Sequence, residues 1–73
     1  MVKQRNDTKR LFKRYMLDNY IDSLLELSKM AGIEYRTFLM RMENPKLFRA
    51  YELKALDEIL NFETDDLIFL IRG

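Results

Sequence analysis

Apolar positions recur along this chain at the spacing of amphipathic helices, and five segments carry the pattern. β-Branched residues are few, and the chain holds a single proline. The pattern therefore predicts an all-α fold, a compact bundle of about five short helices with a central helix-turn-helix. The last segment contains five consecutive apolar residues, 67–71, so a buried strand is an alternative there. The expected helices span residues 8–19, 24–31, 35–43, 50–60 and 64–72.

The first predicted helix separates apolar from basic residues. Its inward side is expected to hold Leu11, Phe12, Tyr15 and Met16, and its outward side Lys9, Arg10, Lys13 and Arg14. Asn6, Asp7 or Thr8 is expected to cap it. Residues 1–7 are then a flexible basic arm, and residues 8–73 form one domain.

Two predicted helices meet at Gly32. Ser23 and Glu26 have the spacing of a capping box at the start of the first of them. Gly32 stands where a helix ends in a left-handed residue, a conformation that glycine adopts because it lacks a Cβ. The following helix ends before Pro45, which forces Asn44 out of the helical region. Helix, glycine turn and helix in this order fit a helix-turn-helix, whose second helix lies in the major groove of DNA.

Residues 23–43 resemble the helix-turn-helix of the lambda-repressor-like, Cro-type (XRE-like) family. The matching positions are a small residue within the first helix, the turn glycine, the apolar residue after it and two buried positions in the second helix, here Ser28, Gly32, Ile33, Phe38 and Met42. Residues 52–68 resemble the family's fourth and fifth helices, so the resemblance covers residues 8–72. It implies a small DNA-binding transcriptional regulator of phage or mobile-element type, which acts by occupying an operator.

Outward positions of the helix after Gly32 are the candidates for reading bases. Arg36 lies in its first turn, and arginine suits a bidentate contact with guanine O6 and N7. Tyr35 is a candidate for a phosphate or sugar contact, Leu39 and Met40 for thymine methyl groups, and Glu43 for cytosine N4.

Charge is unevenly distributed along the chain. Residues 1–14 carry six basic residues and one acidic residue, a net +5, whereas the other 59 carry seven basic and eleven acidic residues, a net −4. A basic end suits a polyanion, although two solvated surfaces explain the asymmetry equally well. Contacts to the DNA backbone are predicted for eight residues: Lys3, Arg5, Arg10, Lys13, Arg14, Arg41, Lys46 and Arg49.

Two further expectations concern protein partners. The last helix is expected to pack on the body through Leu67, Leu70 and Ile71. Ile68 and Phe69 lie off this stripe, which predicts a homodimer interface. Family members favour polar and basic residues at the outward positions where this chain has Leu39, Met40 and Glu43, and Ser or Thr where it has Glu34. The alternative function is therefore a protein-interaction module on the same fold, an antirepressor or inhibitor that binds a regulatory protein through this helix.

Composition limits the remaining classes of function and of ligand. The 73 residues include no Cys and no His, which removes thiolate and imidazole ligands and the usual general base. The acidic residues between 57 and 66 lack the spacing of a calcium loop. Neither a metal, a cofactor nor an enzymatic activity is therefore expected. No apolar run approaches the roughly 18 residues of a membrane span, so we expect no membrane partner and a cytoplasmic, nucleoid-associated location.

Overall fold

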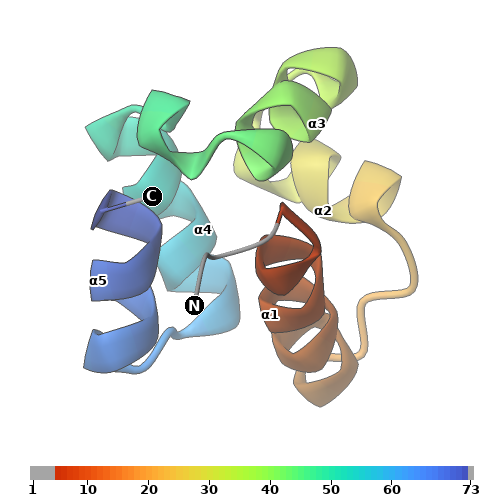
Figure 1. The fold of residues 1–73 in the computed structure, drawn as a ribbon. Coiled ribbons are helices and arrows are strands. Elements are labelled where there is room, and N and C mark those ends of the chain that lie inside the picture. The colour runs from red at the N-terminus through yellow and green to blue at the C-terminus, as the bar shows by residue number, and fades with distance from the viewer. Residues whose placement is uncertain (1–4, 73) are drawn as a thin grey trace.

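The computed structural model describes residues 5–72, and these residues contain five α-helices. They are α1 (Arg5–Asp18), α2 (Leu24–Ala31), α3 (Tyr35–Glu43), α4 (Ala50–Leu60) and α5 (Thr64–Arg72), with a short 3-10 helix, η1 (Pro45–Leu47), between α3 and α4 (Figure 1). The residues that the structure describes contain no strand. The all-α prediction is therefore confirmed, and the strand alternative for residues 67–71 is wrong.

The bounds of four helices match the prediction, but α1 begins earlier than expected. It starts at Arg5, so residues 5–7 of the predicted arm are helical. Thr8 does not cap the helix; it lies inside α1, and its side chain is buried. Asp7 falls in the first turn, where a negative charge favours the helix dipole. The rest of the predicted arm, including Lys3, lies outside the described residues.

The turn between α2 and α3 forms as predicted. Gly32 has φ 72° and ψ 28°, the left-handed conformation, and the backbone N–H of Ile33 donates to Ser28 O at 2.9 Å. At the other end of α2, the predicted capping box forms only in part. Ser23 Oγ accepts from the Glu26 N–H at 3.1 Å, but Glu26 Oε1 accepts from the N–H of Asp22 rather than that of Ser23.

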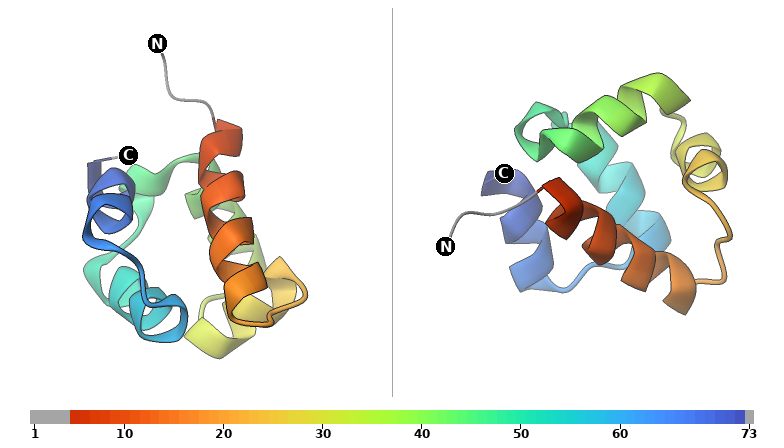
Figure 2. Two further views of the ribbon diagram at one scale, coloured as in Figure 1. Left: turned by 90° about the horizontal axis from the view of Figure 1, so that it is seen from below. Right: turned by 45° about the vertical axis from the view of Figure 1, so that its right-hand side comes forward.

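The core is built around the ring of Phe12 on α1, which is fully buried. Phe38 and Phe62 meet this ring edge to face, with centroids 5.8 and 5.7 Å away, and Phe48 stacks on it at 6.2 Å. These rings come from α3 and from the two connections that flank α4. One aromatic cluster therefore joins both sides of the molecule, with α2 on one side and α5 on the other (Figure 2).

Hydrogen bonds to α1 set the rotation of α5. Asp66 Oδ2 on α5 accepts from Tyr15 Oη and pairs with Arg14 Nη2 at 2.8 Å. Tyr15 Oη in turn accepts from the Glu63 N–H at 3.0 Å. Burial, and next the hydrogen bond to Asp66, raise the pKa of Tyr15, so its hydroxyl remains a donor at neutral pH.

This rotation reverses two expectations for α5. Asp66 and Phe69 lie on the same flank of Leu70, so drawing Asp66 toward α1 turns Phe69 onto the core and Ile71 outward. The predicted exposure of Phe69 is wrong, since this ring is half-buried against the core. Ile71, which we expected to face inward, is 59% exposed. Ile68 is exposed as predicted.

Candidate nucleic-acid interface

The outer face of α3 consists of five residues: Tyr35, Arg36, Leu39, Met40 and Glu43. These residues face outward because Phe38 and Met42, on the opposite side of the helix, are buried in the core with 0% and 1% exposure. On the outer face, Met40 is 58% exposed, Tyr35, Arg36 and Glu43 are exposed, and Leu39 is half-buried. The described chain therefore leaves the five predicted base-reading residues together on one accessible side of a helix.

A shallow hollow follows this face. Its lining comes from α3 and the residues at its two ends: Glu34, Arg36, Thr37, Leu39, Met40, Glu43 and Asn44. Glu34 stands at the start of α3 without capping it, and its Oε1 accepts from Thr37 Oγ1 at 2.9 Å. The hollow is thus lined by one basic residue, Arg36, and by two acidic residues, Glu34 and Glu43. Attraction for a polyanion has to come from elements beside this face.

Two neighbouring elements supply that basic charge. Helix α1 packs against α3 and exposes Arg10 and Lys13 on its outward side. The connection after α3 exposes Lys46 and Arg49. With Arg14, which is also exposed on α1, five of the eight predicted backbone-contacting residues are therefore described and exposed on segments that flank α3. Arg5 belongs to α1.

Arg41, also predicted as a phosphate contact, does not belong to this exposed group because its guanidinium is paired within the fold. Its Nε lies 2.9 Å from Glu52 Oε1 and its Nη2 lies 3.4 Å from Oε2, with the two side chains 13% and 5% exposed. Glu52 Oε1 also accepts from the Arg49 N–H at 2.9 Å. The guanidinium is directed at α4 because Arg41 lies on the side of α3 next to Phe38, away from the outer face.

The Arg41–Glu52 pair holds the connection between α3 and α4 in place. Burial alone would raise the pKa of the Glu52 carboxyl, but the Arg41 guanidinium and the Arg49 N–H lower it below its ordinary value of 4.5. Sequence reasoning missed this pair. The only local signal was the position of Arg41 on the inner side of the helical wheel, and the acid that meets it stands eleven residues further along the chain.

Arg14, another predicted phosphate contact, is also engaged within the fold. Besides its ion pair with Asp66, its guanidinium carbon lies 5.3 Å from the centroid of the Tyr15 ring. Its side chain remains 61% exposed, but the Asp66 carboxylate offsets its charge. Arg14 therefore adds little to the attraction of DNA.

Within residues 5–72, no three His, Cys, Asp or Glu side chains gather where they would hold a metal ion. No described helix has the length and apolar character needed to cross a membrane.

Comparison of the chain with protein-family models, curated proteins and solved structures finds no match. A functional conclusion therefore depends on the residues and geometry above.

Proposed function

We propose that this chain is a small DNA-binding transcriptional regulator of the lambda-repressor-like type, which inserts α3 into the major groove. The single observation that carries the proposal is the accessible outer face of α3, with Arg36 in its first turn, directly after the left-handed turn at Gly32. In the bound state α3 would occupy an operator, and the domain would block or recruit polymerase there.

The dimensions of α3 support this role. An α-helix with its side chains is about 10–12 Å in diameter, which fits a major groove about 12 Å wide, and the nine residues of α3 make a rod roughly 13 Å long to lie along it. Arg36 would read guanine through its bidentate fork, while Leu39 and Met40 would meet thymine methyl groups. Glu43 would accept from cytosine N4.

The exposed basic residues beside α3 would hold the phosphates. Arg10 and Lys13 approach from α1, and Lys46 and Arg49 from the connection after α3. Four such contacts predict that log affinity falls against log salt with a slope of about −4. A slope near zero for binding to random duplex would contradict the contribution of these residues.

Selection from random duplex DNA at physiological salt tests the proposal directly. We expect enrichment of one motif that contains guanine, and weaker binding to duplexes in which that guanine is replaced. A selection that enriches nothing after repeated rounds, together with the absence of salt-dependent binding, would overturn it.

A second function is favoured by the composition of the same face. Tyr35, Leu39 and Met40 expose apolar surface, and the hollow is lined by two acidic residues, Glu34 and Glu43, against one basic residue, Arg36. Such a surface suits a basic, partly apolar protein partner, as an antirepressor or inhibitor would require.

One substitution separates the two functions. Met40→Lys removes the proposed methyl contact of Met40 in the selected motif but adds a positive charge to the exposed centre of the outer face, so it should tighten binding to random duplex DNA if α3 enters the groove. Leu17→Lys is the matched control, because Leu17 is 77% exposed on α1 and lies outside that face. Unchanged or weaker DNA binding by Met40→Lys, with Leu17→Lys tighter, would favour the protein-binding alternative over DNA reading by α3.

A further inference from the structure

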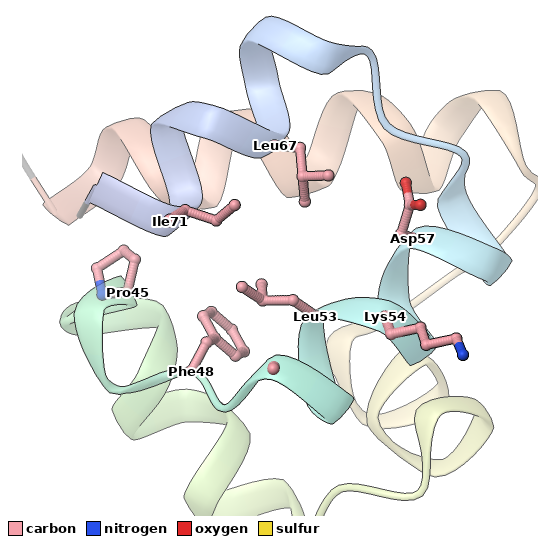
Figure 3. Close-up of a pocket in the computed structure, with 8 residues that line it drawn as sticks. Pro45, Phe48, Leu53, Lys54, Asp57, Leu67 and Ile71 are labelled. Carbon is pink, nitrogen blue, oxygen red and sulfur yellow. The ribbon is translucent and has the colours of Figure 1, made fainter.

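A groove opens between α5 and the segment formed by η1 and the start of α4 (Figure 3). Its volume is about 510 Å³, within the range of roughly 300–1,000 Å³ that small-molecule sites occupy. The residues that line it are Pro45, Phe48, Ala50, Leu53, Lys54, Asp57, Leu67 and Ile71. All but Lys54 and Asp57 are apolar, so the groove offers an apolar ligand a place out of water.

The walls of the groove are held by the fold itself. Phe48 is 8% exposed and stacks on Phe12, so a ring of the aromatic core also lines the groove. Pro45 is buried at the start of η1. Leu53 on α4 and Leu67 on α5 are half-buried against the core. Because core packing fixes these side chains, the groove exists before any ligand enters it.

One carboxylate stands at the end of the groove. Asp57 is half-buried, and Figure 3 shows it at the opposite end of the lining from Pro45. Its Oδ1 accepts from the Phe62 N–H at 3.0 Å, which holds the side chain in position. Within residues 5–72, its Oδ2 has no hydrogen-bond or ion-pair partner. A charged oxygen that borders apolar walls and lacks a donor is matched best by a cationic N–H group.

Lys54, the other charged residue of the lining, does not neutralise this carboxylate. Among the described residues no ion pair joins Lys54 to Asp57. Lys54 is exposed, and Figure 3 shows its ammonium directed away from the apolar lining, so water and salt screen its charge. An anionic ligand would have to leave the apolar walls to reach it. The groove therefore favours a cation over an anion.

We propose that this groove binds a small molecule with an apolar body and one amino group that is protonated at neutral pH. The body lies between Leu67 and Ile71 on one side and Phe48 and Leu53 on the other (Figure 3). The ammonium donates to Asp57 Oδ2. None of these residues belongs to the outer face of α3, so the inference goes beyond the function proposed above and is tested without DNA.

Tryptamine, an indole ring with an aminoethyl chain, is a suitable probe. The chain contains no Trp, so indole emission excited beyond the tyrosine absorption band reports the probe alone. For a ligand of this size we expect an anisotropy titration to give a dissociation constant on the order of 0.1–1 mM. Indole-3-acetate, which carries the same ring and a carboxylate, should bind about tenfold more weakly or less well still. Equal affinity for the two probes would overturn the inference.

Asp57→Asn tests the contact with the amino group. Asparagine keeps the Oδ1 that accepts from Phe62 and removes only the charge, so the fold should be retained. Tryptamine should then bind about tenfold more weakly, while indole-3-acetate should not lose affinity. Glu58→Gln is the matched control, because it removes one negative charge at the next residue of α4, outside the lining. The same loss of tryptamine affinity in both variants would contradict the contact.

Ala50→Phe tests the location of the site. Ala50 is exposed and lines the groove, so a ring there should fill the space and abolish binding of tryptamine with little change in melting temperature. Leu47→Phe adds a ring at an exposed position outside the lining and should bind as wild type does. Normal binding by Ala50→Phe would overturn the inference. So would wild-type amide NMR spectra in which neither tryptamine nor octylamine, at millimolar concentration, shifts the signals of Leu53, Leu67 and Ile71.

Discussion

The inner and outer sides of α3 differ in what constrains their residues. On the inner side, Phe38 and Met42 fill the core and Arg41 meets Glu52, so each side chain has a partner within the fold. On the outer side, Arg36 and Met40 are exposed. Folding therefore restricts the inner residues by volume and hydrogen bonding, while Arg36 and Met40 remain accessible to a partner.

The two sides of α3 should differ most in how much stability is lost when a side chain is truncated, and Phe38→Ala is the first test of this difference. Removing a ring with 0% exposure at the centre of the aromatic cluster should cost about 3–5 kcal/mol of unfolding free energy. Urea denaturation measures this loss. Met40→Ala on the outer side is the control and should stay within about 0.5 kcal/mol of wild type. Equal losses for the two variants would mean that the two sides are not distinct.

The Arg41–Glu52 pair provides the next test of the inner side. Glu52→Gln leaves the guanidinium without its counterion and should destabilise the fold by about 3 kcal/mol at neutral pH, at the low end for buried pairs because Arg41 keeps some exposed surface. Thermal melts at pH 7 measure the loss. Glu58→Gln, at an exposed position on the same helix, should have little effect.

The same pair should make the stability of the fold decrease as the pH is lowered. The pKa of Glu52 is lower in the folded state than its ordinary value of 4.5. The stabilisation that its carboxylate gives to the fold is therefore complete above pH 4.5 and is lost as pH falls through the lower pKa of the folded state. Wild type should therefore lose stability on acidification below about pH 5 more steeply than Glu52→Gln. Parallel stability curves for the two proteins across that window would show that the carboxylate is not held as described.

On the outer side, Arg36→Ala should change DNA recognition rather than stability. We expect a loss of about 1–3 kcal/mol in discrimination between the selected motif and random duplex. Lys13→Ala on α1 is the comparison: it should weaken binding to every sequence alike and reduce the salt slope by about 1. Fluorescence anisotropy at several salt concentrations measures both quantities. The same loss of discrimination in both variants would remove the distinction between base and backbone contacts.

The smallest effect is expected at the turn that joins α2 to α3. A Cβ at Gly32 would meet no heavy atom within 4 Å, so a substitution there changes backbone strain alone. Gly32→Val should cost about 1–2 kcal/mol, because an L residue is disfavoured at φ 72°. Gly32→Asn should cost less, since asparagine tolerates this conformation. A melting temperature for Gly32→Val equal to that of wild type would be inconsistent with the left-handed turn.

Much of the local structure was predictable from the chain. The bounds of α2, α3, α4 and α5, the glycine turn and the burial of Phe38 and Met42 all follow from apolar spacing and end signals within a few residues. The exposure of Arg36 and Met40 follows as well, because a helix that anchors one side must present the other. The candidate outer face was therefore available from sequence, whereas its use in binding DNA stays a prediction.

Other features depended on partners that lie far along the chain. Arg41 was assigned to phosphate although Glu52, eleven residues away, binds it in the fold. Phe69 and Ile71 exchanged roles because α5 is rotated by the bond between Asp66 and Tyr15, which are 51 residues apart. No periodicity within a nine-residue helix specifies which distant side chain will orient it.

The sequence by itself determined where the helices lie and which side of each faces inward, since these depend on spacing along a few turns. Only the tertiary structure decided which charges remain available to a partner, how α5 is rotated and where a groove opens beside it. The physical reason is that hydrogen bonds and close packing act between segments that the fold, rather than the order of residues, brings together.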